Sequence, residues 1–214
     1  MKYDFIVVGA GQAGLSIAYH LKQAGLSFLL IDGDDQVGAS WLKRWDSLSL
    51  FTPSQYNGLP GFDFPMKEGT YPDKNEVARY LSEYVSKFDL PVKLNCSAKK
   101  VTRDGEQYNV ETSTGPMTCT NLIVATGPFH TPFIPGCHND ISADVTQLHS
   151  SNYKNPGQLQ DGDTLVVGAG DSGAQILAEV AQTDRQLYFS GDCSSRVLPQ
   201  EFLGKTLWWW LKGL

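Results

Sequence analysis

A glycine-rich octapeptide occurs twice in this chain, as VVGAGQAG at residues 7–14 and as VVGAGDSG at residues 166–173. Each copy follows a short apolar run and precedes a segment whose apolar residues recur at helical spacing. Strand, glycine turn, helix and second strand therefore follow one another at residues 3–31 and again at residues 164–190. Two βαβ units of this kind predict an α/β protein built on parallel strands.

The first glycine turn has the form G-x-G-x-x-G, in which each glycine has a separate physical task. Gly9 permits a tight turn, Gly11 lets the backbone approach a pyrophosphate, and Gly14 lets the helix pack closely on its strand. The phosphates then lie on free N–H groups at the positive end of the helix dipole. Asp32 ends the second strand, where a carboxylate can accept hydrogen bonds from ribose hydroxyls. A plain turn without a ligand is the alternative.

The second copy repeats this spacing with Gly168, Gly170 and Gly173. Ser172 is placed to cap the helix or to bind phosphate. Asp192 after the second strand favours NADH, whereas Arg196 favours NADPH, so the preferred nucleotide stays open. Two such turns predict two dinucleotides, and hydride transfer from a nicotinamide to a flavin is the chemistry that needs both.

The segment between the two units does not repeat. Residues 33–71 predict a long loop rich in Gly, Pro and aromatic residues, and residues 73–88 predict an amphipathic helix. Short strands at 92–94, 108–112 and 117–119 are predicted to form an antiparallel meander, followed by a buried strand at 121–125. Residues 132–162 read as a connector. We expect domain 1 to span residues 1–155 and domain 2 to span residues 156–214.

Composition narrows the function further. The net charge of −6 argues against nucleic acid as a partner, and no apolar run is long enough to span a bilayer. The start of the chain has no signal region, which favours a cytoplasmic location. The four histidines show no metal-ligand spacing. The four cysteines form no C-x-x-C pair and are interpreted as packing residues: Cys96, Cys119, Cys137 and Cys193.

With these motifs in hand, the chain resembles the flavin-containing monooxygenases, in particular their small bacterial CzcO-like branch. VGASW at 37–41 is similar to a G-G-x-W segment of that family, with Ala39 in place of the second glycine. WDSLSLFTPSQYNGLPG at 45–61 resembles the loop that folds over the flavin, here called the 45–61 loop. ATGPFHTPFIPG at 125–136 resembles the segment that closes on FAD. VVGAGDSGAQILAEV resembles the NADPH turn.

The resemblance implies a fold of two Rossmann-like, three-layer ββα domains of the FAD/NAD(P)-binding type, with the second domain and the end of the first incomplete. It implies two cofactors, FAD and NADPH or NADH. The expected FAD contacts are Gly9, Gly11, Gln12, Ala13, Gly14, Asp32, Gly38, Ser40, Trp41, Val101, Ala125, Thr126 and Gly127. The expected NAD(P)H contacts are Gly168, Gly170, Asp171, Ser172, Gly173 and Arg196.

Candidate catalytic residues are fewer, because in this family the flavin carries the chemistry. Asn57 and Gln55, amides in the 45–61 loop, are expected to hydrogen-bond the flavin or its peroxide, and an ordinary turn role is the alternative. Trp41 and Trp45 either wall the flavin or pack in the core. His149 either orders the connector near the nicotinamide or is a surface histidine.

The chain departs from the family pattern in two ways. Of the signature F-x-G-x-x-x-H-x-x-x-[YF] only His149 and Tyr153 remain, since Ala143 and Val145 replace Phe and Gly. The chain is also shorter than such proteins usually are, and it ends in the apolar segment LWWWLKGL. Either it is a fragment, or a partner chain or a second copy covers this tail.

Three functions follow from the resemblance. The first is an FAD- and NAD(P)H-dependent monooxygenase that uses O2 and acts on soft nitrogen or sulfur centres of a small molecule through a flavin C4a-hydroperoxide. The second is an NAD(P)H-dependent flavin oxidoreductase or oxidase without oxygen transfer. The third is a truncated, non-enzymatic FAD-binding subunit.

Overall fold

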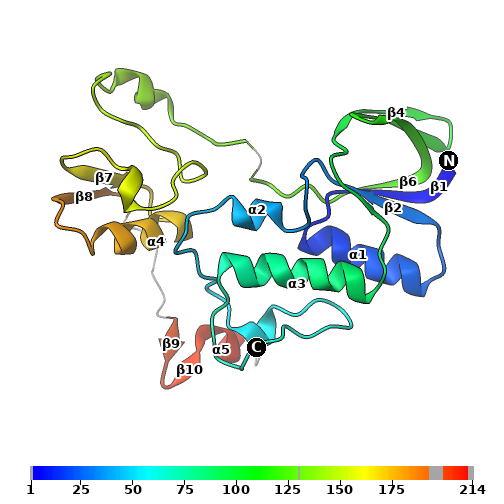
Figure 1. Cartoon of the computed structure of the whole chain (residues 1–214), viewed down its shortest axis with the longest axis horizontal. Coiled ribbons are helices and arrows are strands. Elements are labelled where there is room, and N and C mark those ends of the chain that lie inside the picture. Colours follow the sequence, from blue (N-terminus) through cyan, green and yellow to red (C-terminus); the bar gives the residue numbers. More distant parts are fainter. Residues whose placement is uncertain (1, 130, 193–199, 212–214) are drawn as a thin grey trace. The chain divides into compact units, whose positions relative to one another are not determined.

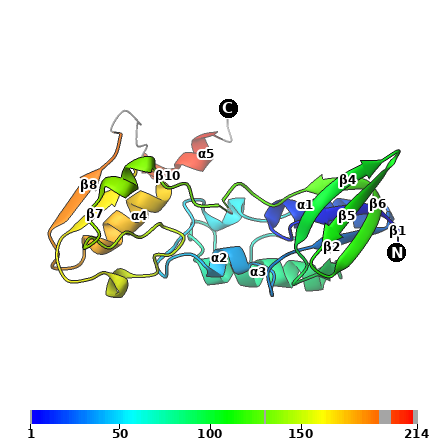
Figure 2. The ribbon, with the colours of Figure 1, turned by 90° about the horizontal axis from the view of Figure 1, so that it is seen from above.

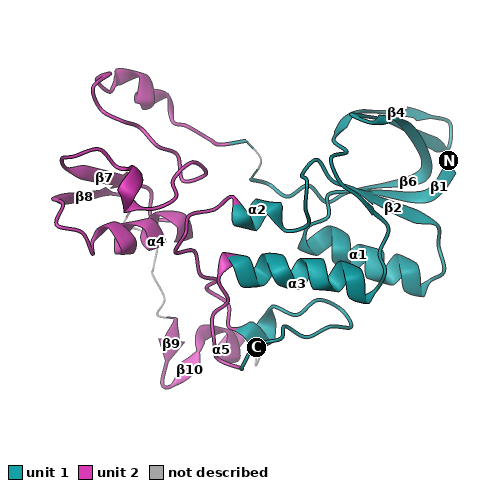
Figure 3. Ribbon diagram, in the orientation of Figure 1, with its two compact units in different colours: residues 1–42, 54–67, 75–131 teal, residues 43–53, 68–74, 132–214 magenta. Residues whose placement is uncertain are grey.

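The computed structural model describes residues 2–129, 131–192 and 200–211 (Figure 1). The chain forms two compact units (Figure 3). Unit 1 consists of residues 1–42, 54–67 and 75–131, and unit 2 of residues 43–53, 68–74 and 132–214. The second unit therefore takes two segments from the first half of the sequence. The domain boundary expected at residue 155 concerns nucleotide-binding domains and stays a prediction.

Unit 1 contains a six-stranded mixed sheet in the order β3-β2-β1-β6-β5-β4. Its strands are β1 (Lys2–Val8), β2 (Phe28–Ile31), β3 (Val92–Lys93), β4 (Ala98–Asp104), β5 (Gln107–Thr112) and β6 (Gly115–Val124). The parallel partners β2 and β6 lie on either side of β1, so the carboxyl ends of these strands meet at one edge. That edge carries the first glycine turn.

The sheet of unit 1 has different cover on its two faces. The helices α1 (Gln12–Gln23) and α3 (Lys74–Lys87) run side by side (Figure 1), and the ring of Tyr19 contacts that of Phe88 at 4.9 Å between centroids. Val7 faces α1, because its Cγ1 lies 3.5 Å from where a Cβ on Gly14 would be. The next side chain, Ile6, points to the other face and packs with residues of the antiparallel strands: Val110 and Cys119. The result is the predicted three-layer ββα arrangement.

The structure corrects three details of the predicted strands. β3 pairs in parallel with β2 and is no part of the meander. β4 was not predicted, because its sequence AKKVTRD is almost entirely exposed and charged, as edge strands often are. β6 is one strand of 10 residues rather than two, because its first half pairs with β5 and its second half with β1.

The predicted long loop of residues 33–71 is ordered by short elements and by two buried tyrosines. It contains α2 (Ala39–Leu42) and a 3-10 turn, η1 (Ser54–Tyr56). The Tyr80 hydroxyl donates to the Phe62 carbonyl and accepts from the Leu59 N–H, each at 2.6 Å. The Tyr84 hydroxyl donates to the Pro60 carbonyl at 2.6 Å. Burial raises the pKa of Tyr84 to about 12, so its phenol stays a donor at neutral pH.

Unit 2 contains the second βαβ unit. Figure 2 shows α4 (Asp171–Val180) lying against the two parallel strands β7 (Thr164–Val167) and β8 (Leu187–Ser190). The connector holds two 3-10 turns, η2 (Gly136–Asp140) and η3 (Pro156–Gln158). The last described elements are β9 (Glu201–Phe202), β10 (Lys205–Thr206) and α5 (Leu207–Leu211). Trp209, Trp210 and Leu211 of α5 are exposed, and a partner that covers them stays a prediction.

The cysteine prediction holds only in part. Cys96 and Cys119 are buried free thiols in the core of unit 1, as expected of packing residues. Cys137 is exposed, because it lies on η2 of the connector rather than in a core, so that prediction was wrong for this residue. Cys193 lies outside the described residues. No helix in the described part of the chain is both long enough and apolar enough to cross a membrane.

Candidate functional site

The first glycine turn joins β1 to α1 and has the geometry that the sequence predicts. Gly9 has a φ of +108°, a conformation that glycine adopts without strain. A Cβ on Gly9 would lie 2.4 Å from the Ala125 carbonyl oxygen, and one on Gly14 would lie 2.0 Å from the Gly9 carbonyl oxygen. Packing therefore requires both glycines.

Gly11 differs from these two glycines, because nothing lies within 4 Å of the place where its Cβ would be. It is the N-cap of α1, and no side chain caps the helix there. The first N–H groups of a helix have no acceptor within the helix. Bare backbone, free N–H groups and open space therefore coincide at Gly11 and at the adjoining, exposed Gln12 and Ala13. This arrangement fits a diphosphate.

Asp32 is held rigidly beside this turn. Its Oδ2 accepts a hydrogen bond from the Ala10 N–H at 2.7 Å, and its Oδ1 accepts one from the Asp34 N–H at 3.0 Å. A carboxylate has about four acceptor sites, so acceptors remain for ribose hydroxyls. The 125–127 segment reaches the same edge, since the Ala125 N–H donates to the Val8 carbonyl at 2.8 Å. The exposed Thr126 and Gly127 follow directly.

The other predicted FAD contacts of unit 1 lie on two further elements. Gly38 has a φ of +82° and packs so closely on α3 that a Cβ would lie 2.7 Å from the Ala78 Cα. It precedes α2, which carries the exposed Ser40 and the half-buried Trp41. Val101 lies on the edge strand β4, opposite Val110 of β5, and is exposed. Contact of these residues with FAD stays a prediction.

The predicted catalytic amides lie on and after η1. Asn57 is buried, and its N–H donates to the Ser54 carbonyl at 3.0 Å, whereas Gln55 is exposed. The Ser54 hydroxyl donates to the Lys67 carbonyl at 2.7 Å. Together with the hydrogen bonds of the Tyr80 and Tyr84 hydroxyls, these contacts hold the backbone of residues 54–62 in place. The backbone contact of Asn57 fits the turn role, and a role toward a flavin stays a prediction.

The second glycine turn, between β7 and α4, reproduces the first. Gly168 has a φ of +111°, and a Cβ on Gly173 would lie 2.0 Å from the Gly168 carbonyl oxygen. Gly170 is the N-cap of α4 and again has nothing within 4 Å of its Cβ position. Ser172 therefore does not cap the helix, and its predicted phosphate contact stays open. Asp171 is exposed in the first turn of α4.

The two turns differ at the position of the ribose carboxylate. The Gly9 N–H donates to the Ile31 carbonyl, and the Gly168 N–H donates to the Ser190 carbonyl, which aligns Ile31 with Ser190. Gly191 therefore stands where Asp32 stands in the first site. Asp192 follows one residue later and is exposed, and Arg196 lies outside the described residues.

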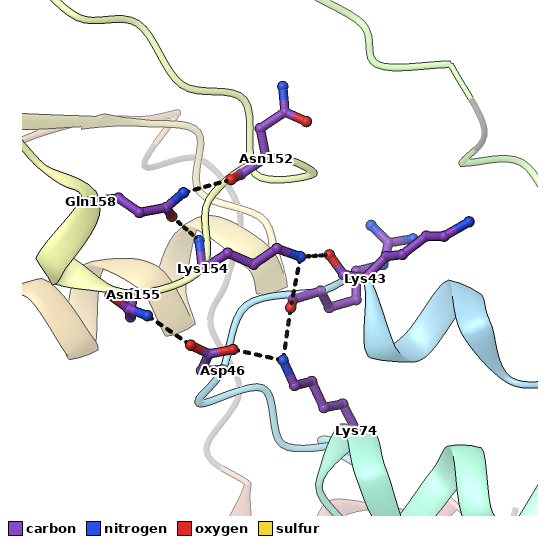
Figure 4. Close-up of polar contacts among 8 residues, drawn as sticks. Lys43, Asp46, Lys74, Asn152, Lys154, Asn155 and Gln158 are labelled. Atoms are coloured by element: carbon purple, nitrogen blue, oxygen red, sulfur yellow. Dashed lines mark hydrogen bonds and ion pairs between the residues drawn. The ribbon is translucent and has the colours of Figure 1, made fainter.

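A polar network inside unit 2 was not predicted from the sequence (Figure 4). The buried ammonium of Lys74 forms an ion pair with Asp46 Oδ1 at 2.8 Å and donates to the Arg44 carbonyl at 3.0 Å. Asn155 donates to Asp46 Oδ2 at 2.7 Å, and Lys154 donates to the Lys43 carbonyl. These contacts join the inserted segments 43–53 and 68–74 to the connector. These contacts join residues far apart in the sequence, so no local sequence pattern predicts the network.

His149 and Tyr153 anchor the end of the connector. The His149 carbonyl accepts from the Asn152 and Tyr153 N–H groups, and His149 Nδ1 accepts from the Ser151 N–H at 3.1 Å. The buried Tyr153 donates to Glu179 Oε2 at 2.7 Å. Burial, together with this hydrogen bond, raises the pKa of Tyr153. Trp45 is buried, which fits core packing, although its Nε1 has no hydrogen-bond partner among the described residues.

The network at Asp46 predicts acid-sensitive stability. The hydrogen bonds from Lys74 and Asn155 hold the pKa of Asp46 below its ordinary value of 3.8. A lowered folded-state pKa means that ionised Asp46 stabilises the fold above that ordinary value, and that this contribution is lost as pH falls through the folded pKa. We expect Asp46→Asn to lower the melting temperature at pH 7 and to flatten its decline below about pH 5. Asp161→Asn, at an exposed site, is the control, and equal melting curves for D46N and D161N would contradict the expectation.

The fold and the two turns together define an α/β protein of the two-dinucleotide type. A sequence profile of one family, described as pyridine nucleotide-disulphide oxidoreductase, matches residues 6–194. The chain belongs to this family.

Individual relatives of the chain are oxidoreductases and flavin monooxygenases. The chain is 42% identical over 211 residues to the "Uncharacterized oxidoreductase CzcO-like" of Geobacillus kaustophilus, covering 99% of this chain and 60% of the relative. A solved flavin-containing monooxygenase from Stenotrophomonas maltophilia is 33% identical with a TM-score of 0.84, over 94% of this chain and 61% of that one. OTEMO, solved in complex with FAD and NADP, is 25% identical with a TM-score of 0.69, over 87% of this chain and 38% of that one.

These comparisons confirm the resemblance to CzcO-like flavin monooxygenases and the predicted fold. The chain spans about 60% of the length of the CzcO-like relative and of the Stenotrophomonas maltophilia enzyme, and 38% of that of OTEMO. The family description mentions a disulphide, yet the sequence holds no C-x-x-C pair.

Proposed function

We propose that the chain is the nucleotide-binding part of an FAD- and NADPH-dependent monooxygenase that acts on a soft nitrogen or sulfur centre of a small molecule. One observation carries the proposal: two glycine turns of the same geometry, each with bare, open backbone at the N-cap of a helix. The relatives solved as flavin monooxygenases support the reaction class. O2 is the co-substrate.

In this proposal the chain's residues bind and orient rather than react. Gly11, with the first N–H groups of α1, holds the FAD diphosphate, and Asp32 holds a ribose. Gly170, with α4, holds the diphosphate of NADPH. When bound, the flavin supplies hydride acceptance and oxygen activation. Residues 54–62 keep their conformation during turnover, because hydrogen bonds from tyrosine hydroxyls and within the backbone hold them.

The second turn favours NADPH over NADH. Among the described residues, Gly191 aligns with Asp32 and brings no carboxylate to that position, while the exposed Asp192 stands one residue beyond it. The relative solved with NADP supports the same preference.

The proposal is tested by spectroscopy and stoichiometry. We expect the purified chain with added FAD to absorb near 450 nm, about where bound flavins absorb, and NADPH to bleach this band without oxygen. In air, thioanisole or N,N-dimethylaniline should give one sulfoxide or N-oxide per NADPH. If all NADPH appears as H2O2, the protein is an oxidase. If the chain binds no FAD, the proposal fails. The alternative function, a non-enzymatic subunit, then holds only if another chain supplies the flavin.

A further inference from the structure

Ser49 lies in a short extended stretch of unit 2 that is paired on one side. It forms an antiparallel bridge with Asp73, and the neighbouring Leu50 N–H donates to the Pro72 carbonyl at 2.8 Å. In an antiparallel pair, successive residues point their N–H and C=O groups to opposite sides. The Leu50 bond therefore turns the N–H and C=O of Ser49 away from Asp73, toward what would be an open strand edge.

A single side chain occupies that edge. Gln175 Oε1 accepts a hydrogen bond from the Ser49 N–H at 3.3 Å, and Gln175 Nε2 donates to the Ser49 carbonyl at 2.8 Å. The amide thus completes the ladder as another strand would. A carboxylate of the same shape offers no donor, and an aliphatic side chain offers neither group.

Gln175 comes from the helix that begins at the second glycine turn. It lies five residues after Gly170, one turn into α4, and it is half-buried. Ser49 belongs to the 45–61 loop, in the part of it that is built into unit 2. The adjoining Leu48 is buried, and its N–H donates to the Trp45 carbonyl at 3.3 Å. One hydrogen-bonded contact therefore connects the start of α4 with this part of the loop.

We infer that Gln175 is a positioning residue that couples nucleotide binding at the second glycine turn to the order of residues 48–50. A diphosphate bound to the first N–H groups of α4 restrains that end of the helix, and Gln175 passes the restraint to the Ser49 backbone. Coupling through shared ordering is reciprocal, so a well-ordered 48–50 segment also tightens nucleotide binding. The inference rests on the proposed function, since it needs NADPH at this turn.

Amide hydrogen exchange tests the coupling without turnover. We expect NADP⁺ to slow exchange at residues 166–174 and also at 48–50 in the unaltered chain. In Gln175→Leu the slowing at 166–174 should remain, while exchange at 48–50 should be roughly five- to tenfold faster and no longer respond to NADP⁺, because the Ser49 N–H loses its acceptor and the Ser49 carbonyl loses its donor. Gln175→Glu keeps an acceptor for the Ser49 N–H but sets a carboxylate oxygen against the Ser49 carbonyl, and this repulsion should loosen residues 48–50 in the same direction. This variant serves if the leucine variant does not fold.

Gln182→Glu is the matched control, because Gln182 is exposed just beyond α4 and the same charge is added. It should leave exchange at 48–50 as in the unaltered chain. With FAD bound, Gln175→Glu should slow flavin reduction at saturating NADPH and leave the FAD content unchanged, whereas a merely structural loss would lower both. Protection at 166–174 without any response at 48–50 overturns this inference alone. Absence of protection at both segments overturns the proposed nucleotide site as well.

Discussion

Replacing Gly14 with Ala should strongly destabilise unit 1, whereas replacing Gly11 with Ala should give a folded protein that binds FAD more weakly. The new Cβ at residue 14 would lie 2.0 Å from the Gly9 carbonyl oxygen, and backbone atoms cannot move aside cheaply. Such overpacking costs at least about 3 kcal/mol, the upper end of the usual range. That is a large share of a typical domain stability of about 5–15 kcal/mol.

Gly11→Ala isolates the ligand from the fold. Its φ of −82° suits alanine, and open space surrounds the new methyl group. We expect a stability loss of only about 1 kcal/mol, from the poorer N-cap. The methyl group would stand between the backbone and the diphosphate, however, and weaken FAD binding by roughly tenfold to a hundredfold, as for about 1–3 kcal/mol of overpacking. Thermal unfolding and flavin absorbance measure the two effects separately. A stable G11A protein that binds FAD as tightly as the unaltered chain would contradict the first site.

The predicted parts of the fold are those that local chemistry determines. An apolar run, a glycine turn and helical periodicity lie within 30 residues of one another in each βαβ unit, so the sequence pattern suffices to place β1, α1, β7 and α4. β4 could not be predicted from such a pattern, because the charged residues of this exposed edge strand are equally typical of a loop: Lys99, Lys100 and Arg103. The parallel direction of β3 was not predicted, because a strand of two residues carries no pairing information. It follows only from the pairing of Val92 in β3 with Leu30 in β2.

The set of chain segments that make up unit 2 could not be predicted either, for a different reason. Lys74 begins a helix whose remaining residues belong to unit 1, yet its side chain pairs with Asp46, and Gln175 binds Ser49 across more than a hundred residues of sequence. Single polar residues of this kind are indistinguishable from surface residues until tertiary contacts bring them together. The glycine turns were predictable because the close backbone packing at Gly9, Gly14 and Gly173 leaves no room for a side chain. The side chains that hold the 45–61 loop were not.

The second glycine turn permits the same separation of fold from ligand. We expect Gly170→Ala to fold, to bind FAD normally and to raise the KM for NADPH by roughly tenfold to a hundredfold, for the same steric reason as at Gly11. Its φ of −77° suits alanine, and nothing lies within 4 Å of the added methyl group. Anaerobic titration of the flavin band with NADPH measures the change.

Gly173→Ala is the contrasting variant at this turn, since its Cβ would lie 2.0 Å from the Gly168 carbonyl oxygen. We expect it to lose the βαβ structure of unit 2, seen as fast hydrogen exchange through β7 and α4. Because the first turn lies in unit 1, G170A should differ from G11A in retaining the yellow colour, although each replaces a glycine with the same surroundings. If G170A binds NADPH as the unaltered chain does, the second turn holds no diphosphate, and the similarity of the two turns is one of folding alone.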